Sequence, residues 1–430
     1  MEYKLGEICT FQEGYVNPSQ KVAKYFDGPH KWVRAVDVNN NEIFNTSRTL
    51  SEEGFESAKK SAYKFPTNSI VMTKSGTIGR VAIIKDKMAG NRATINIVPN
   101  EKNVSLYYLF YLLITKRHDL ENLAVGSVQK NLYISVLSNV KINIPELRKQ
   151  YKIAEILKNI DDIIMSNNKI IANLEELSQT LFKRWFVDFE FPDENGNPYK
   201  SSGGEMVDSE LGEIPINWNL VKLGSIANIR TGYAFKSTEY IEQIQLPVLR
   251  TLNISKSNLL VTMNDIKFVP YQYLYMDKYQ KYNLELFDTL LVTVGGSIGN
   301  LGLVTENNLP SLQNQNMWRF RSIKSNISNT LIYQLILYVN SLVYNQTSGS
   351  AREFYTKKTF ENFNLLLPKL DSYLYESINK YLENFGKKIS DLNVEIEKLT
   401  QLRDTLLPKL MSGEIEIPDH IEVNEDELSI

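Results

Sequence analysis

The sequence contains a single cysteine, Cys9, among its 430 residues. One cysteine excludes a disulfide framework and any cysteine-based zinc site. The three histidines, His30, His118 and His420, are scattered and form no pair at metal-ligand spacing. The longest apolar runs are far shorter than the ~20 residues that span a bilayer, and no signal-peptide pattern follows Met1. These absences predict a cytoplasmic protein without a bound metal.

Motifs of catalytic sites are also missing. The sequence has no Gly-Lys-Ser/Thr phosphate loop and no Gly-x-Ser-x-Gly nucleophile elbow. Gly295–Gly299 resembles a nucleotide-binding turn only loosely, and its counterpart at Ser75–Gly79 favours a structural turn that occurs twice. Asn197-Pro198-Tyr199 matches part of an amino-methyltransferase motif, but it lies in a predicted linker. We therefore expect no catalytic residue and no cofactor site in this chain.

The net charge of −2 conceals a strong division along the chain. Residues 1–148 and residues 217–370 each carry an excess of six positive charges, whereas the remaining segments together carry an excess of fourteen negative charges. Two basic segments could face phosphates, and the acidic segments would be repelled from them. An excess of six is also common on ordinary protein surfaces, so charge alone leaves both interpretations open.

The sequence consists of one unit that is used twice. Matching landmarks recur in the same order, with an offset that changes only from 218 to 223 residues. This period is far too long for a solenoid repeat and predicts an internal pseudo-dimer. The matching landmarks are Leu5–Ile8 with Leu223–Ile226, Gly14-Tyr15 with Gly232-Tyr233, Ser75–Gly79 with Gly295–Gly299, Gly126-Ser127 with Gly349-Ser350, and Pro145 with Pro368.

Each copy mixes short β-branched runs with turn signals, which predicts the α+β class. Polar interruptions are too frequent for a doubly wound parallel sheet. The predicted strands are 68–73, 80–84, 94–98, 289–294 and 301–305, and the predicted buried helices are 107–115 and 330–343.

Both copies are followed by a 3.5-residue apolar repeat, which is typical of a coiled-coil seam. Asn167 interrupts the first seam and could fix the helix register, or it could lie at a wet or fraying position. The two helices, each about 50 Å long at ~1.5 Å per residue, most simply pair antiparallel with each other, and a bundle with a partner's helices is the alternative. The predicted seams are Leu157, Ile160, Ile164, Asn167, Ile171, Leu174, Ser178, Leu181 and Trp185, and then Ile378, Leu382, Phe385, Ile389, Leu392, Ile396 and Leu399, followed by a shift to Leu402, Leu406 and Leu410.

These patterns predict two similar mixed α/β recognition domains that are joined to two long helices, with internal pseudo-twofold symmetry. The predicted boundaries are 1–148 for the first domain, 149–187 for the first helix, 188–216 for a linker, 217–370 for the second domain, 371–412 for the second helix and 413–430 for an acidic, solvated or loosely docked tail.

Polar turns in both copies are candidates for nucleic-acid contact. Glycine and serine allow the backbone to approach the duplex, while Arg, Lys, Asn and Gln carry the hydrogen bonds that reach phosphates and base edges. For each residue the alternative is an exposed turn residue without a specific role. The candidates are Lys74, Ser75, Thr77, Arg80, Ser127, Gln129, Lys130 and Asn131 in the first copy, and Ser297, Asn300, Ser350, Arg352, Lys357 and Lys358 in the second.

Three stretches resemble the specificity subunit of type I restriction–modification systems. They are Leu181–Glu190, the run Leu211–Pro215 with Trp218, and Leu402–Ile415. The resemblance extends over essentially the whole chain, in the order recognition domain, helix, recognition domain, helix. The first copy departs from the family pattern because it lacks the Ile-Pro-x-x-Trp sequence that opens the second.

This resemblance implies a non-catalytic subunit, in which each recognition domain binds one half of a split DNA target. It also implies partners: double-stranded DNA, methyltransferase subunits, two in number, and a restriction subunit that is a translocase and nuclease. S-adenosylmethionine, ATP and Mg would bind to those partners. The alternatives are a coiled-coil scaffold protein and a stand-alone DNA methyltransferase. The residues expected to contact the partner subunits are Leu181, Phe182, Trp185, Phe186, Leu406, Leu407 and Leu410.

Overall fold

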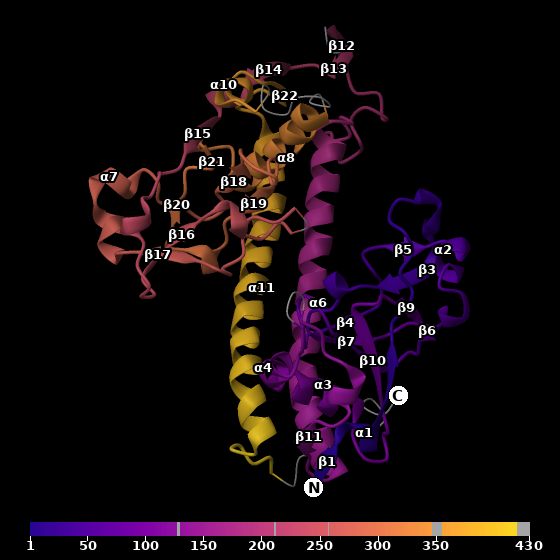
Figure 1. The fold of residues 1–430 in the computed structure, drawn as a ribbon. Helices are drawn as coiled ribbons and strands as arrows, with labels where there is room; N and C mark the ends of the chain where they lie inside the picture. The colour runs from indigo at the N-terminus through magenta and orange to yellow at the C-terminus, as the bar shows by residue number, and fades with distance from the viewer. Residues whose placement is uncertain (127–129, 210–211, 257, 346–354, 419–430) are drawn as a thin grey trace. The chain divides into compact units, whose positions relative to one another are not determined.

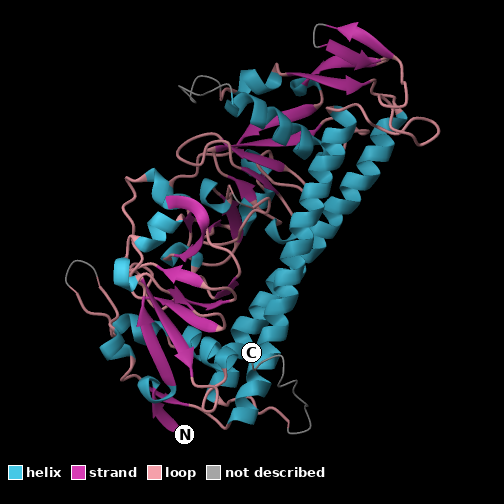
Figure 2. Ribbon diagram, turned by 90° about the vertical axis from the view of Figure 1, so that its right-hand side faces the viewer, coloured by secondary structure: helices cyan, strands magenta, loops and turns pink. Residues whose placement is uncertain are grey.

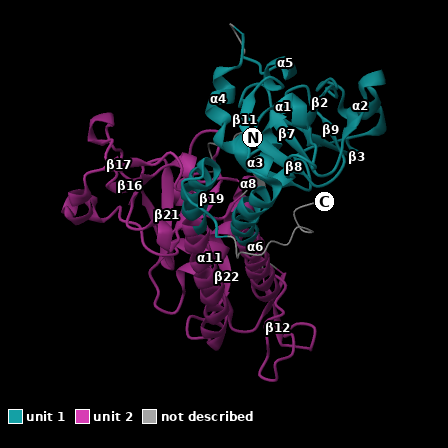
Figure 3. Ribbon diagram, turned by 90° about the horizontal axis from the view of Figure 1, so that it is seen from below, with its two compact units in different colours: residues 1–164, 399–430 teal, residues 165–398 magenta. Residues whose placement is uncertain are grey.

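The computed structural model describes residues 1–126, 130–209, 212–256, 258–345 and 355–418 (Figure 1). The chain divides into two compact units (Figure 3). Unit 1 contains residues 1–164 and 399–430, and unit 2 contains residues 165–398. The boundary between the units therefore falls inside both long helices, so each unit contains a globular head and one part of each helix.

Head 1, the part of unit 1 that precedes the first long helix, is built on two sheets and a short strand pair. The five-stranded sheet has the order β2-β10-β7-β8-β4, the four-stranded sheet has the order β5-β3-β9-β6, and β1 pairs with β11. The elements are β1 (Glu2–Lys4), α1 (Leu5–Ile8), β2 (Cys9–Glu13), β3 (Phe26–Val33), β4 (Asn41–Ile43), β5 (Thr49–Leu50), α2 (Glu52–Glu56), β6 (Lys64–Phe65), β7 (Ser69–Thr73), β8 (Val81–Ile84), β9 (Met88–Gly90), β10 (Thr94–Pro99), α3 (Leu106–Thr115), α4 (Arg117–Asn122), α5 (Ile134–Leu137), β11 (Lys141–Asn143) and the long helix α6 (Leu147–Phe186).

Head 2, in unit 2, repeats this arrangement with one strand fewer in each of the two larger sheets. Figure 2 shows the helices and strands of the described residues. The order β15-β21-β18-β19 corresponds to β2-β10-β7-β8, the order β17-β16-β20 corresponds to β5-β3-β9, and β14 pairs with β22 as β1 pairs with β11. The elements are β12 (Met206–Ser209), β13 (Gly212–Pro215), β14 (Trp218–Lys222), β15 (Ala227–Thr231), β16 (Leu246–Leu249), β17 (Lys267–Val269), α7 (Asp277–Gln280), β18 (Thr289–Val292), β19 (Leu301–Leu303), β20 (Leu312–Gln313), β21 (Met317–Ser322), α8 (Asn329–Asn345), α10 (Lys357–Glu361), β22 (Asn364–Pro368) and the long helix α11 (Tyr373–Ser412).

The shared topology confirms the predicted duplication and the α+β class. In both heads the central sheet is antiparallel along the matching four strands, and one parallel pair lies in the second sheet: β3 with β9, and β16 with β20. Every strand and buried helix predicted from the sequence is present, with ends that differ by a few residues. The helix α3 packs against β7 and β8, and α8 packs against β18 and β21. As a result, α3 is buried along Leu106–Leu113.

The long helices α6 and α11 pair antiparallel. In unit 2 the Trp185 ring lies 6.3 Å from the Tyr381 ring, and Ile171 clusters with Ile389 and Leu392, so residue numbers rise along one helix as they fall along the other. The predicted first seam is confirmed, since none of its nine residues is exposed. Asn167 is 7% exposed, and its Nδ2 has no hydrogen-bond partner among the described residues.

The predicted end of the second seam is wrong at Leu402, whose side chain is 47% exposed. Arg403 faces inward instead and donates from Nη1 to the Asp161 carboxylate at 2.7 Å, within unit 1. Burial alone would lower the pKa of Arg403, but the hydrogen bond and charge of Asp161 outweigh it and raise the pKa. An ion pair therefore occupies the position where the repeat predicted a leucine.

The predicted linker and the predicted tail both make packing contacts. In the linker, the Tyr199 ring stacks on Phe191 at 4.5 Å, and Phe191 stacks on Trp218 at 5.6 Å. In the tail, Ile415 and Ile417 pack against the core of unit 1. Residues 419–430 lie outside the described part. Among the described residues, no helix combines the length and hydropathy that a membrane crossing requires.

Candidate nucleic-acid interface

Three chain connections meet at one edge of the central sheet of head 1: the segments that follow β2 and β7, and the segment that precedes β10. Because neighbouring strands are antiparallel, the ends of β2 and β7 lie beside the beginning of β10. The Gly14 N–H donates to the Thr94 carbonyl at 3.0 Å, and the Lys74 N–H donates to the Ala93 carbonyl at 2.8 Å. The turns that follow these strands are therefore held next to one another by backbone hydrogen bonds.

The predicted turn at Lys74–Arg80 and the predicted loop near Asn131 are brought together at this edge. Ser75 forms an isolated β-bridge with Asn131, and the Leu132 N–H donates to the Lys74 carbonyl at 2.9 Å. Gly76 and Gly79 both have positive φ angles, of 75° and 79°, which residues with a side chain rarely adopt. Sequence separation of more than fifty residues hid this contact. Ser127 and Gln129 lie outside the described residues.

The predicted contact residues of head 1 differ in their exposure and in their pairing with other groups of the head. Lys130 is exposed, and Ser75 is half-buried. Lys74 pairs with the Glu13 carboxylate at 2.9 Å, and its side chain is only 15% exposed, so its charge is compensated inside the head. The hydroxyl of Thr77 and the Nε of Arg80 are buried without a hydrogen-bond partner in the described residues. Lys130 and Ser75 are thus the better placed candidates.

The same edge exists in head 2. The Thr293 N–H donates to the Asn316 carbonyl at 3.2 Å, and the Tyr233 N–H donates to the Gln313 carbonyl at 2.9 Å. Ser297 is half-buried in the turn, whereas the Asn300 amide donates to the Ile254 carbonyl at 3.3 Å. Asn300 therefore anchors the turn to the neighbouring loop, while Ser297 remains available at the edge.

Lys357 and Lys358 do not continue the loop that was predicted for the second copy. They lie on α10, where Lys357 pairs with Glu361 at 3.2 Å. This short helix corresponds to α5 of head 1, so the prediction paired the two lysines with the wrong part of the first copy. Ser350 and Arg352 lie outside the described residues.

Sequence reasoning missed four residues at these edges. Tyr15 is 51% exposed and Arg92 is exposed in head 1. In head 2 the ammonium of the exposed Lys278 lies 4.9 Å from the ring centre of Tyr233. The repeated Gly-Tyr pair was a signal for both tyrosines. It was used only to align the copies, and no pattern marked Arg92 or Lys278.

The glycines of these pairs are required by close backbone approach. A Cβ on Gly14 would lie 2.1 Å from the Asn91 carbonyl oxygen, and one on Gly232 would lie 2.2 Å from the Asn314 carbonyl oxygen. No side chain can occupy that space. The duplicated glycine therefore keeps the tyrosine-bearing turn pressed against the start of β10 in one head and of β21 in the other.

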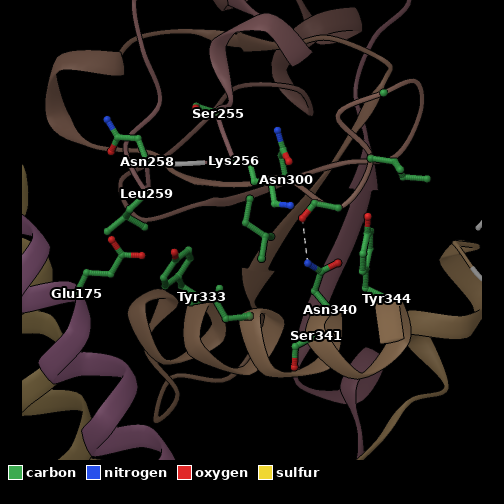
Figure 4. A pocket seen from close by; sticks show the side chains of 15 residues that line it. Glu175, Ser255, Lys256, Asn258, Leu259, Asn300, Tyr333, Asn340, Ser341 and Tyr344 are labelled. Atoms are coloured by element: carbon green, nitrogen blue, oxygen red, sulfur yellow. Dashed lines mark hydrogen bonds between the residues drawn. The ribbon is translucent and has the colours of Figure 1, made fainter. Parts of the chain in front are cut away.

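A cavity of about 490 Å³ lies behind the glycine turn of head 2 (Figure 4). Two side-chain amides that line the cavity donate hydrogen bonds to backbone carbonyls. Asn340 donates to the Gly299 carbonyl at 2.9 Å, and Asn300 donates to the Ile254 carbonyl. Burial raises the pKa of the Glu175 carboxyl on α6, and it also raises the pKa of Tyr333 far above its usual value. The Asn340 side chain, on α8, thus holds the turn against this helix.

The described residues contain no cluster of three or more His, Cys, Asp or Glu side chains that could hold a metal ion. The edges offer instead exposed cations, hydroxyls, amides and aromatic rings on connections fixed by backbone hydrogen bonds. Such groups suit phosphate contact and base-edge hydrogen bonding.

Comparison with known proteins decides the family. Residues 1–176 and 215–401 match the family model described as type I restriction modification DNA specificity domain. The chain belongs to this family. The two matched regions begin at the two copies of the repeat, so the type I specificity family accounts for the duplication over most of the sequence.

Two curated relatives cover most of the chain. The type I restriction enzyme MjaIX specificity subunit of Methanocaldococcus jannaschii is 27% identical, over 96% of this chain and 92% of the relative. The HindI specificity subunit of Haemophilus influenzae is 24% identical, over 74% and 79%. The crystal structure of a type I S subunit from M. genitalium aligns with a TM-score of 0.57 at 17% identity, covering 98% of this chain and 96% of the other. This likeness supports the type I specificity fold.

Most of the residues that were predicted to contact partner subunits are buried within this chain. Phe182, Trp185 and Phe186 are each 6% exposed in the core of unit 2, and Leu407 and Leu410 are 7% and 3% exposed in the core of unit 1. Leu181 and Leu406 are half-buried. The motifs that carry the family resemblance at the helix ends thus hold this chain's own heads to its helices, because their apolar side chains fill its cores.

Proposed function

We propose that this chain is the DNA specificity subunit of a type I restriction–modification system, with each head reading one half of a split target. The observation that carries the proposal is the duplicated edge. The same three connections meet in both heads, held by equivalent backbone hydrogen bonds, while the exposed side chains differ. A common scaffold with different contact groups is what two different half-sites require.

The charge distribution supports DNA as the ligand. The two heads are basic, and the helices, linker and tail are acidic. Because neutralised phosphates dominate DNA affinity, exposed cations such as Lys130 and Arg92 in head 1 contribute mainly to sequence-independent attraction. Hydroxyls and amides on the same edge, such as Ser75, supply the base-edge contacts.

The proposal assigns the chemistry to partner subunits. Methyltransferase subunits would carry S-adenosylmethionine, and a translocase–nuclease subunit would use ATP and Mg. Since the motif residues of α6 are buried, the methyltransferase contact lies elsewhere on the helix. In unit 2, Ile170 and Leu177 are 39% and 53% exposed and stand seven residues apart, which places them on one face of α6. This exposed stripe replaces Phe182, Trp185 and Phe186 as the proposed helical docking surface.

The methylome of cells that carry this chain with its methyltransferase partner tests the function. We expect methylated adenines in one split motif whose two parts are separated by a fixed gap. Methylation without sequence preference, or within one uninterrupted short motif, would contradict the proposal.

Single variants in the assembled complex test the edge. Lys130→Ala and Arg92→Ala should weaken DNA binding for all sequences and lower the salt slope, by about one unit per lost phosphate contact. Lys102→Ala is the matched control, because Lys102 is also exposed but follows the other end of β10, beside Cys9. A larger effect at Lys102 than at Lys130 would place the DNA at the opposite edge of the sheet and contradict the proposed interface.

A further inference from the structure

One unusually exposed aliphatic side chain occupies the same position of the repeat in each head. Apart from Met1, four large hydrophobic side chains among the described residues are more than two-thirds exposed: Val36 at 69%, Ile244 at 85%, Leu252 at 74% and Tyr275 at 68%. Val36 and Leu252 are equivalent in the repeat. Each stands two residues after an arginine, in Arg34–Val38 and Arg250–Ile254.

Both side chains are presented by the same rigid turn. The 3-10 helices Ala35–Asp37 and Thr251–Asn253 carry Val36 and Leu252. The Arg34 N–H donates to the Asp37 carboxylate at 2.9 Å, and the Arg250 N–H donates to the Asn253 amide oxygen at 2.9 Å. The residues that follow, Val38 and Ile254, are buried and anchor the turns. We name Val36 and Leu252 the knobs.

Packing within each head does not explain the knobs, because most of their surface contacts solvent. Single exposed aliphatic residues are common and need no explanation. A pair kept at one position is different, since an exposed aliphatic residue is retained there while its neighbours Ala35 and Asp37 are replaced by Thr251 and Asn253 in head 2. A feature that both heads share is expected to face something that both heads meet.

DNA is a poor match for the knobs. In the major groove, a side chain without polar atoms reads a base edge through the methyl group of thymine, and the same preference in both heads would not distinguish two different half-sites. The adjacent arginines are directed toward their own heads: Arg34 donates from Nη2 to the Ser47 hydroxyl at 2.7 Å, and the Arg250 guanidinium donates to the Asp265 carbonyl. An apolar socket on a protein fits the knobs better.

We propose that Val36 and Leu252 are matching docking knobs for a protein partner that binds the two heads through two equivalent apolar sockets. Under the proposed function, on which this inference rests, that partner is the methyltransferase subunit. The position of the knobs, close to the DNA-facing edges, suits a subunit that modifies DNA. The carbonyls of Val33 and Leu249, just before the turns, accept hydrogen bonds from the Asn91 and Asn314 N–H groups at 3.0 Å each, at the DNA-facing edges.

Lysine substitution separates a protein partner from DNA, because it has opposite effects on the two. Val36→Lys and Leu252→Lys should each weaken binding of one methyltransferase subunit at least tenfold, since a charge cannot enter an apolar socket without a large desolvation cost. Native mass spectrometry of the co-expressed complex should show one methyltransferase per chain for each single variant and none for the double variant, against two for the unmodified chain. If the knobs faced phosphates, lysine would instead raise DNA affinity and leave assembly unchanged, which would overturn the proposal.

Three controls keep the outcome specific. The size exchange Val36→Leu with Leu252→Val should preserve assembly, and Ile244→Lys, at an exposed position without a duplicate, should leave it unchanged. Thermal melting of the isolated variants should match the unmodified chain, because the knobs are largely exposed. If the unmodified complex methylates a split motif and the lysine variants assemble normally, the docking role of the knobs is refuted while the proposed function stands. An unmodified chain that binds no methyltransferase refutes the proposed function and the knobs together.

Discussion

At the residue scale, the duplicated glycine offers a direct test of backbone packing. Gly232→Ala should lower the free energy of unfolding by about 1–3 kcal/mol, because its Cβ would meet the Asn314 carbonyl and force a backbone shift. Gly296→Ala is the matched control in the same head, since no atom lies within 4 Å of its Cβ and its φ is not positive. Urea unfolding of both variants measures the difference. Equal stability of the two would contradict the close approach.

Glu175 makes stability depend on pH in an unusual direction. Burial raises the pKa of its carboxyl above the ordinary 4.5, so the folded state holds this proton more tightly than the unfolded state. The contribution of Glu175 to stability is therefore present at low pH and is lost as pH rises through its raised pKa.

We expect Glu175→Gln to raise the melting temperature at pH 7 and to change it little near pH 4. The effect should be small, because the carboxylate is partly solvated and the Gln179 amide donates to it at 3.2 Å. Melting curves of both proteins across this pH range provide the measurement. A variant that is less stable than the original chain at pH 7 would show that the ionised carboxylate is favourable in its site.

Residue-scale prediction from the sequence had clear limits. The turn at Ser75 and the loop at Asn131 were each recognised by composition, but their contact joins segments that are more than fifty residues apart. The compensation of Lys74 by Glu13 arises because β2 and β7 lie on either side of β10. Charge type is visible in a sequence, whereas the partner that neutralises it is fixed by the tertiary fold.

At the element scale, periodic patterns located the helices and strands well. Heptads predicted α6 and α11, and β-branched runs predicted β7, β8, β10, β18 and β19. The patterns failed where a polar group replaced an apolar one. Leu402 continues the leucine spacing, yet Arg403 turns inward because Asp161 lies opposite in unit 1. Parallel pairs such as β3 with β9 were also invisible, since they join strands distant in sequence.

Head 2 is attached to α11 by a buried polar network. The Asn393 amide donates to the Thr305 hydroxyl and to the Asn307 side-chain oxygen, both at 2.9 Å, and the Glu306 N–H donates to the Ser390 hydroxyl at 3.0 Å. The Asn307 amide also donates to Glu397 at 3.1 Å. These contacts fix one register between the head and the helix.

Asn393→Ala should destabilise unit 2 by about 1–3 kcal/mol, because it removes two hydrogen bonds and leaves buried groups without their partner. Glu395→Ala, at an exposed position two residues along the same helix, should change stability by less than about 0.5 kcal/mol. Hydrogen exchange across residues 301–309 should rise in the first variant only. Unchanged protection there would show that apolar packing alone attaches the head.

At the scale of the whole molecule, α6 and α11 are equal in length, at 40 residues each, and the unit boundary crosses both. Under the proposed function these helices set the gap between the half-sites. Adding seven residues to each helix at the unit boundary, near Ile164 and Lys398, preserves the heptad phase. It lengthens each helix by about 10 Å at ~1.5 Å per residue.

The methylated motif of this insertion variant should keep both half-sites and gain about three base pairs of gap, given ~3.4 Å per base pair. The two heads keep their own cores, so base recognition has no reason to change. Inserting seven residues in α6 alone is the control, and it should abolish methylation because the antiparallel register is lost. An unchanged gap in the double insertion would show that partner subunits, and not these helices, determine the spacing, whereas altered half-sites would show that the helices also shape the recognition edges.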